Sequence, residues 1–237
     1  MRYACISDIH GNLPAFTAVI KDLSLQDIDG VIFLGDLVFL GLYPQECFDA
    51  LEQLNPIICI KGNTDGNLEE VKTFTPSSEF EQELLDLILF CDDRLTSLAK
   101  ETIASWPIAR PLQDFLCCHG SPYSFKESLS DKGSLSHELK QKLSKEQAHI
   151  ILAGHTHHSC DFSTMGKRII NPGAIGYAFD GDRRASYAIL DGKKVEFRHV
   201  AYDWQEYLAE LNAQIKKYPL LKSIAYAIEH ARPMQFN

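Results

Sequence analysis

Tyr-Ala-Cys-Ile at residues 3–6 runs directly into Ser-Asp-Ile-His-Gly-Asn at residues 7–12, so a short apolar segment ends in side chains that can perform chemistry. Similar apolar runs recur at residues 31–34, 57–60, 115–118 and 150–153. They are followed by Gly-Asp at 35–36, Lys-Gly-Asn at 61–63, His-Gly at 119–120 and Gly-His-Thr-His at 154–157. The runs do not alternate with polar residues, which is typical of strands buried on both faces.

Helical patterns separate the first three apolar runs. Leu13, Phe16, Ile20 and Leu23 share one helix face, with Asn12 as N-cap, and a second helix is predicted over Pro44–Leu54. Strands that alternate with helices form a parallel sheet, and ligands bind beyond the carboxyl ends of such strands. The five strand ends are therefore expected to place Asp, His and Asn side chains along one rim.

The rest of the chain predicts helices and a second sheet. Two helices, Glu79–Cys91 and Thr96–Ser105, are expected to lie over or beside the sheet, with a substrate cap or an oligomer contact as alternatives for the first. Residues 121–148 are expected to form a loop and then a helix. Strands at Arg168–Ile170, Ala185–Leu190 and Lys194–Val200, the last two joined by the turn Asp191-Gly192, suggest an antiparallel second sheet packed on the first.

The simplest organisation is one domain over residues 1–237, with a helical excursion at about 75–107 and a C-terminal helical segment at about 203–232. Hydrophobic residues make up 45% and charged residues 23%, which is ordinary globular usage. A net charge of −9 disfavours binding to long nucleic acid through a broad basic surface. It still allows phosphate binding where a metal supplies positive charge.

The expected compartment is the cytoplasm. The apolar stretch at the N-terminus is too short for a signal peptide and is interrupted by Asp8. No apolar run approaches the ~20 residues of a membrane span. The seven cysteines form no CxxC pair and lie mostly in apolar runs, which favours a reducing compartment over a disulfide framework.

The polar residues at the strand ends form a candidate metal-ligand set of two carboxylates, one amide and four imidazoles: Asp8, His10, Asp36, Asn63, His119, His155 and His157. Mixed oxygen and nitrogen ligands suit Mn, Fe, Zn or Co. Seven ligands exceed the needs of one ion, so two ions that share a carboxylate are expected, with Asp36 as the candidate bridge. Asp8 and His10 lie two residues apart, as do His155 and His157. In extended backbone each pair would face one side and could serve one centre.

These motifs resemble the calcineurin-like metallophosphoesterases in order and spacing across residues 1–176. The matching segments are Asp-Ile-His-Gly-Asn at 8–12, Gly-Asp at 35–36, Gly-Asn-Thr-Asp at 62–65, His-Gly at 119–120 and Gly-His-Thr-His at 154–157. Asn-Pro-Gly at 171–173 and Arg-Ala-Ser-Tyr at 184–187 look like a prokaryotic subgroup of phosphodiesterases and relatives of diadenosine tetraphosphatases. The resemblance implies an α/β fold, a four-layer αββα sandwich of the metallo-dependent phosphatase type.

The resemblance also assigns ligands and an activity. Asp8, His10 and His157 would hold the first metal, Asn63, His119 and His155 the second, and Asp36 would bridge them. Catalytic roles are expected for Asp36, Asn63, Asp8 and His10. The implied activity is hydrolysis of a phosphodiester, phosphomonoester or phosphoanhydride through a metal-bridging hydroxide. Mn²⁺ is the first expectation for both ions, with Fe, Zn or Co as alternatives.

One position departs from the pattern, because many family members carry His directly after the Asn of the third motif and this chain carries Thr64. Thr cannot protonate a leaving group near neutral pH, so diesters or anhydrides are expected as preferred substrates. Asp65 or a histidine of the polar segment could serve as the acid instead. Asn12, Thr64 and Arg184 are the candidate substrate-binding residues, with a helix cap as the alternative role of Asn12.

A phosphorylated small molecule or a nucleotide is the expected partner. For a dinucleoside substrate, Tyr123, Phe125 and Lys126 after the fourth motif could supply a platform. A phosphoprotein is the alternative, which would make the chain a serine/threonine protein phosphatase of the same superfamily. A catalytically silent metal-binding scaffold is the second alternative. No membrane partner is expected, and the sequence leaves the oligomeric state open.

Overall fold

The computed structural model describes residues 1–71, 73–130 and 135–235. The strands are β1 (Arg2–Ile6), β2 (Gly30–Phe33), β3 (Ile58–Cys59), β4 (Ala109–Leu112), β5 (Phe115–Cys118), β6 (Ile150–Leu152), β7 (Ser159–Thr164), β8 (Lys167–Pro172), β9 (Ala185–Asp191) and β10 (Lys194–Val200). The helices are α1 (Leu13–Leu23), α2 (Pro44–Leu54), α3 (Asn63–Glu70), α4 (Glu79–Asp92), α5 (Ser97–Ser105), α6 (His137–Lys145), α7 (Trp204–Gln214) and α8 (Leu221–His230).

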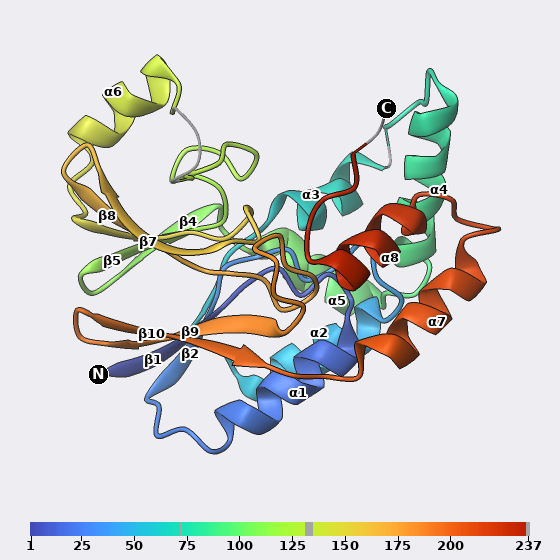
Figure 1. Ribbon diagram of the computed structural model, residues 1–237. Helices are drawn as coiled ribbons and strands as arrows, with labels where there is room; N and C mark the ends of the chain where they lie inside the picture. Colours follow the sequence, from blue (N-terminus) through green and yellow to red (C-terminus); the bar gives the residue numbers. More distant parts are fainter. Residues whose placement is uncertain (72, 131–134, 236–237) are drawn as a thin grey trace.

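The strands form two five-stranded sheets that face each other (Figure 1). The first has the order β10-β9-β1-β2-β3, with β1, β2 and β3 parallel and the β9–β10 hairpin antiparallel to β1. The second has the order β4-β5-β6-β8-β7, with β5, β6 and β8 parallel and an antiparallel strand at each edge.

The apolar runs are continuous because each strand is covered on both faces. In β1, Tyr3 and Cys5 point into the layer between the sheets, whereas Ala4 and Ile6 point to the helices outside the first sheet. The alternation in β5 is the same, since Phe115 belongs to the layer between the sheets and Cys118 packs with α6. A side-chain period of two inside an all-apolar segment therefore serves two cores at once.

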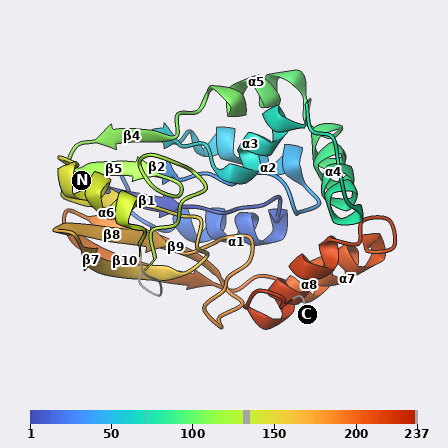
Figure 2. The same cartoon turned by 90° about the horizontal axis from the view of Figure 1, so that it is seen from above.

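Helices cover the outer face of each sheet and complete four layers (Figure 2). Phe16 of α1, Leu51 of α2 and Ile103 of α5 pack in the core of the first sheet. Leu139 and Leu143 of α6 cover the second sheet. The expected α/β fold with an αββα sandwich is confirmed.

Two assignments of strands to sheets were wrong. The runs at 115–118 and 150–153 do not extend the first sheet but form the centre of the second, and the hairpin at 185–200 joins the edge of β1 instead of building the second sheet. The cause is long-range pairing, because strands covered on both faces look alike in either sheet. The rim of candidate ligands is consequently shared between two sheets. Of the predicted loop and helix at 121–148, residues 131–134 lie outside the described residues.

The helical excursion packs partly on the C-terminal helices and partly on the first sheet. Leu87 and Phe90 of α4 share a core with Tyr207 of α7 and Ile224 of α8, and both views place these helices together beyond the strand ends (Figures 1 and 2). The end of α4 at Cys91, the residues Leu95 and Trp106 on either side of α5, and α5 itself pack in the core of the first sheet. Among the described helices, none combines the length and the apolar character that a bilayer crossing requires.

Candidate metal centre

The candidate ligands come from both sheets and meet at the carboxyl ends of the parallel strands. Asp8 and His10 follow β1, Asp36 follows β2, and Asn63 is the first residue of α3. The second sheet supplies His119 after β5, and His155 and His157 after β6. The structure therefore brings together all seven residues that the sequence singled out.

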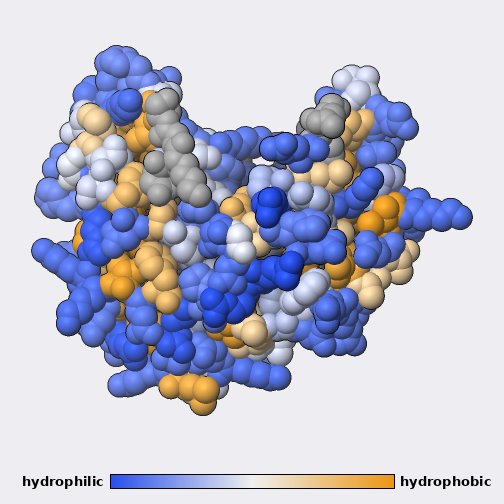
Figure 3. Space-filling model, viewed as in Figure 1, coloured by the Kyte–Doolittle hydropathy of each residue, from blue (hydrophilic) through white to orange (hydrophobic). Residues whose placement is uncertain are grey.

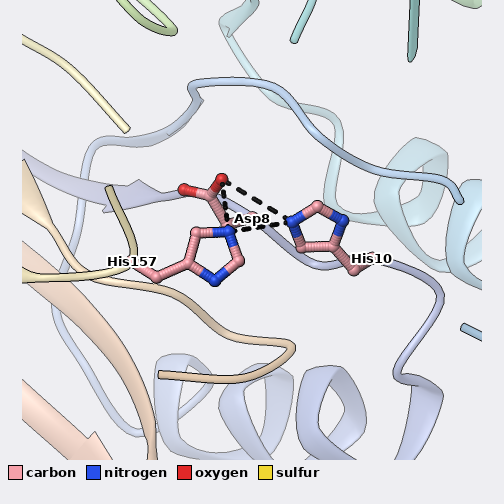
Figure 4. Close-up of side chains that lie close together, drawn as sticks. All are labelled: Asp8, His10 and His157. Carbon is pink, nitrogen blue, oxygen red and sulfur yellow. Dashed lines mark hydrogen bonds and ion pairs between the residues drawn. The ribbon is translucent and has the colours of Figure 1, made fainter. Parts of the chain in front are cut away.

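Asp8, His10 and His157 form the first group, with ligand atoms that all lie within 4.8 Å of one another (Figure 4). His157 Nε2 lies 3.3 Å from Asp8 Oδ1 and 3.0 Å from His10 Nε2. Asp8 Oδ2 accepts a hydrogen bond from the backbone N–H of His155 at 3.1 Å. One carboxylate oxygen is thus used to hold the loop, while the other faces the two imidazoles.

Asp36, His119 and His155 form the second group, again within 4.8 Å. Asn63 adjoins it, because Asn63 Oδ1 lies 3.1 Å from His119 Nε2. Asp36 Oδ2 lies 3.3 Å from His119 Nε2 and 3.6 Å from His10 Nε2. Asp36 therefore faces members of both groups.

Backbone carbonyl groups orient three of the four imidazoles. Nδ1 of His10 lies 3.2 Å from Phe39 O, Nδ1 of His119 lies 2.8 Å from Leu34 O, and Nδ1 of His157 lies 2.6 Å from Tyr177 O. A carbonyl oxygen only accepts, so each Nδ1 carries the proton and donates it. In a neutral ring this leaves the lone pair on Nε2, which points into the cluster, as metal-ligating histidines require.

The backbone at the ligands is not extended. Asp8, His10, Asp36, His155 and His157 all have left-handed φ values, between 49° and 69°. Extended backbone was therefore the wrong basis for the expectation that each pair serves one centre. Asp8 and His10 do share the first group, whereas His155 and His157 point into different groups. Left-handed backbone at non-glycine residues is costly and gathers at functional sites.

Burial and the neighbouring charges set the protonation of the cluster. Burial lowers the pKa of His10 to about 4, despite the opposing pull of Asp36. Burial by itself would raise the pKa of Asp36, but the charge and hydrogen bond of His119 outweigh it and hold that pKa well below its ordinary value. For His119, burial is outweighed by the charge of Asp36, which raises the pKa to about 9. A metal ion at His119 would therefore displace a proton.

Two observations show that this donor set fits metal ions. Asp8 Oδ1 is buried and has no hydrogen-bond partner among the described residues. The Nε2 atoms of His10 and His157 lie at hydrogen-bond distance although both Nδ1 atoms already carry protons. Buried polar atoms without partners are costly, and a cation at the first group would satisfy them. Carboxylates, imidazoles and an amide are ligands that Mn, Fe, Zn and Co accept.

Asp65 fixes the loop that carries Asp36. Its carboxylate accepts hydrogen bonds from the backbone N–H groups of Asp36, Leu37, Val38 and Gly62 at 2.9–3.3 Å. Burial, followed by the charge of Asp36, raises the pKa of Asp65 to about 7, while the N–H donors pull it down. Both oxygens are engaged by the backbone, so Asp65 is a structural clamp and is poorly placed to act as the general acid.

Of the three candidate substrate-binding residues, Asn12 is held by the protein itself. Asn12 Oδ1 caps α1 by accepting from Ala15 N–H, and Nδ2 donates to Gly176 O and Tyr202 OH. Asn12 is 1% exposed, so the structure supports the helix-cap alternative. Both hydrogens of its amide group have protein partners.

Thr64 and Arg184 have different surroundings. Thr64 N–H donates to Asp36 Oδ1 at 2.9 Å, and Thr64 Oγ1 is buried without a partner in the described chain, which places this residue beside the cluster. Arg184 is exposed and forms an ion pair with Asp182, with Nη2 and Oδ2 2.5 Å apart. Lys126, one of the candidate platform residues, pairs with Glu70 on the surface.

Two aromatic residues were missed by the reasoning from sequence. The Tyr177 ring stacks on His10 with a centroid distance of 4.8 Å, and the Phe179 ring stacks on His157 at 4.7 Å. They wall the first group on the side of the loop that precedes β9. The only sequence signal is their place shortly after the Asn-Pro-Gly segment at 171–173.

Comparison with known proteins identifies the family. Residues 1–194 match the calcineurin-like phosphoesterase superfamily domain. The chain belongs to this superfamily. It is therefore a metal-dependent phosphoric ester hydrolase by family, which confirms the resemblance and the class of enzyme predicted from the motifs.

Individual relatives extend the match to the whole chain. An uncharacterized protein of Methanocaldococcus jannaschii is 28% identical over 228 residues, which cover 84% of this chain and 87% of that protein. A crystal structure of a metallophosphoesterase from Sphaerobacter thermophilus superposes with a TM-score of 0.77 at 27% identity, and covers 98% of this chain and 99% of that one. A hypothetical protein from Pyrococcus horikoshii has the same fold, with a TM-score of 0.79, 21% identity, and 98% and 99% coverage.

Proposed function

We propose that this phosphoesterase is dinuclear and hydrolyses phosphodiester or phosphoanhydride bonds of small phosphorylated molecules or nucleotides. The observation that carries the proposal is the position of Asp36 Oδ2, 3.6 Å from His10 in one group and 3.3 Å from His119 in the other. A carboxylate that faces both groups is suited to bridge two ions. Asp8, His10 and His157 would hold one ion, and Asn63, His119 and His155 the other, with Mn²⁺ in both as the first expectation.

Two ions of this kind, when bound, neutralise phosphate oxygens and activate a water molecule as the nucleophile. The chain's own residues keep the ligands in place. The carbonyl groups of Phe39, Leu34 and Tyr177 hold Nε2 of three histidines toward the cluster, and Thr64 N–H fixes Oδ1 of Asp36. This support is built before substrate arrives, so little reorganisation is needed during the reaction.

The preference for diesters or anhydrides rests on what surrounds Asp36. Thr64 occupies the position after Asn63 and has no proton to give near neutral pH, while Asp65 is engaged by four backbone N–H groups. General-acid catalysis raises the rate by roughly 10²–10⁴-fold. Without a general acid, the rate falls most for substrates with poor leaving groups. Substrates whose leaving group needs no protonation are therefore expected to react best.

The proposal is tested with chelator-treated protein, assayed on bis-(p-nitrophenyl) phosphate and on p-nitrophenyl phosphate with and without Mn²⁺. We expect metal-dependent turnover, faster on the diester, with about two Mn²⁺ ions retained per chain after gel filtration. Asp36→Asn is expected to lower turnover by at least ~10²-fold, as for other groups that organise a transition state.

Asp114→Asn is the matched control, because it makes the same chemical change at an exposed position in the turn between β4 and β5. It should retain wild-type turnover and metal content. No turnover with Mn, Fe, Zn or Co would contradict the proposed hydrolase and favour a metal-binding scaffold. One retained ion per chain would contradict the dinuclear centre.

A further inference from the structure

A polar groove of about 580 Å³ lies where the loop before β9 meets the start of α7 and the end of α8. Its lining includes three arginines, one histidine and two aromatic residues: Arg183, Arg184, Arg232, His230, Tyr202 and Trp204. Strongly hydrophilic side chains gather at this place in the middle of the face shown in Figure 3, below the hollow at the upper edge of the molecule. Its α7 and α8 part lies beyond residue 194, where the match to the family domain ends.

Two of the guanidinium groups in this groove have no carboxylate partner in the described part of the chain. Asp182 neutralises Arg184, and His230 faces the carboxylate of Glu229 at 3.6 Å. By contrast, Arg183 donates to the backbone carbonyl of Glu229 and lies over the Trp204 ring at 4.8 Å. Arg232 makes only a long contact of 3.5 Å to His230 O. In a chain with a net charge of −9, the groove keeps two positive charges.

Guanidinium groups in this arrangement suit a phosphate. The group is planar, stays charged at any physiological pH, and binds phosphate oxygens with paired N–H donors. The stacking of Arg183 on Trp204 and its bond to Glu229 O hold the side chain in position, so less conformational entropy is lost when an anion binds.

The groove is linked directly to the candidate metal centre by the loop 176–181. Gly176 N–H donates to Asp8 O at 2.7 Å, and Phe179 N–H donates to His157 O at 3.0 Å. At the other end, Gly181 N–H donates to Ala231 O at 3.0 Å. Phe179, which stacks on His157, lies three positions before Asp182 in the lining of the groove, so their Cα atoms are at most about 11 Å apart. One short loop thus carries both an aromatic wall of the metal centre and part of the groove.

We propose that Arg183 and Arg232 bind a second phosphate group of the substrate, separate from the phosphate that is hydrolysed. The preferred substrate is then a phosphodiester or anhydride that carries an additional phosphate on the part that lies toward α8. This inference rests on the proposed function, since it names the substrate class of the same site. The groove acts through substrate affinity, so it changes KM and leaves the bond-breaking step to the metal centre.

The test compares two diesters with the same leaving group, thymidine 5′-(p-nitrophenyl phosphate) and its 3′-phosphorylated form. For the Mn²⁺-loaded wild type we expect a KM about tenfold lower for the 3′-phosphorylated compound, as for a charge-assisted contact. In the double variant Arg183→Gln/Arg232→Gln the two KM values should converge, with kcat on the unphosphorylated compound unchanged. Arg110→Gln, at an exposed position on β4, is the matched control and should keep the wild-type difference.

A binding measurement separates failure of the groove from failure of the hydrolase. Calorimetric titration of chelator-treated protein with pyrophosphate should show binding that is about tenfold weaker in the double variant. Equal KM values for the two diesters in the wild type would overturn the inference, even with the pyrophosphate difference, because the groove would then serve a separate anion. No turnover of either diester would contradict both the proposed function and the role of the groove in substrate binding. Equal pyrophosphate binding in wild type and double variant would exclude the anion site itself.

Discussion

His10 Nε2 and His157 Nε2 lie 3.0 Å apart, although 147 residues separate them in the chain. Both rings donate Nδ1–H to a backbone carbonyl, of Phe39 and Tyr177 respectively. Two neutral rings held in this way would direct lone pairs at each other, which is unfavourable in a buried place. Asp8 Oδ1 faces the same point and has no hydrogen-bond donor among the described residues. A cation at this point would give all three atoms a partner.

Metal binding is therefore expected to stabilise the folded chain. At a free metal concentration of about 100 times Kd, linkage gives about 2.7 kcal/mol. For a chain of this size that raises Tm by roughly 5–10 °C. Differential scanning calorimetry of chelator-treated protein, with and without Mn²⁺, measures the shift.

His10→Gln should lose more than half of this shift, whereas His137→Gln, at an exposed position on α6, should keep it. A Tm that none of Mn, Fe, Zn or Co raises would contradict a metal centre in this cluster.

The close approach of Gly62 to Asp36 predicts a sensitive position. A Cβ atom on Gly62 would lie 2.0 Å from Asp36 Oδ1 and 2.3 Å from Asp36 N. Because Asp65 and Thr64 hold Asp36 on the other sides, Gly62→Ala must displace the carboxylate. We expect hydrolysis of bis-(p-nitrophenyl) phosphate to fall by at least about 100-fold and unfolding free energy to fall by about 1–3 kcal/mol.

Gly66→Ala is the control from the same helix. Its Cβ would meet only the Phe125 ring, at 3.2 Å, and Ala favours a helix. Activity near wild type in Gly62→Ala would show that the position of Asp36 is not critical.

Thr64 predicts how rate depends on the leaving group. The wild type should hydrolyse p-nitrophenyl phosphate faster than glycerol 2-phosphate, since the alkyl leaving group needs a proton. Thr64→His should raise turnover of the alkyl ester by roughly tenfold or more and change the aryl ester little. Thr64→Asn adds a polar side chain that has no titratable proton, and it should leave the ratio of the two rates unchanged. Comparable wild-type rates on both esters would contradict the missing-acid interpretation.

A partly exposed ion pair on the helix-covered face of the first sheet predicts an acid-sensitive part of the stability. Asp22 of α1 accepts hydrogen bonds from Arg198 Nε at 2.9 Å and Tyr187 OH at 2.6 Å. The Arg198 bond first, and then that of Tyr187, lower the pKa of Asp22 below its ordinary value. A depressed pKa stabilises the fold above about pH 4, and this contribution disappears as the pH falls through the folded-state pKa.

Asp22→Asn should therefore lower Tm by about 2–4 °C at pH 6, which corresponds to about 1 kcal/mol. The difference from wild type should shrink toward pH 3. Asp27→Asn, at an exposed position, is the control and should cost little at either pH. A Tm difference that stays constant from pH 6 to pH 3 would rule out the linkage.

The local elements follow closely from the sequence. The predicted α2 has the observed bounds Pro44–Leu54, and Asn12 caps α1 as its side chain allows. The choice of sheet could not be predicted, because Phe115–Cys118 has the same two-sided apolar pattern as β1. That choice depends on contacts between residues far apart, such as Cys5 with Ala188 in the β1–β9 pairing.

The candidate ligands were predictable because their side-chain types are rare at strand ends and recur five times. Their distribution between the two groups did not follow from spacing, which would have put His155 and His157 together. The family resemblance alone implied the separation that the structure shows. The sequence also does not predict that Arg183 and Arg232 line one groove. They lie 49 positions apart, and the packing of α8 brings them together.

The order of the ligands along the chain has a consequence for biosynthesis. Asp8 and His10 are synthesised well before their third partner, His157, which lies 147 positions after His10. The other group likewise waits for His155. Neither three-residue group exists on a nascent chain that stops short of residue 155. Neither group could therefore bind a metal ion through its full set of ligands before that point, and a product truncated there would carry strands of both sheets and still lack a complete ligand set.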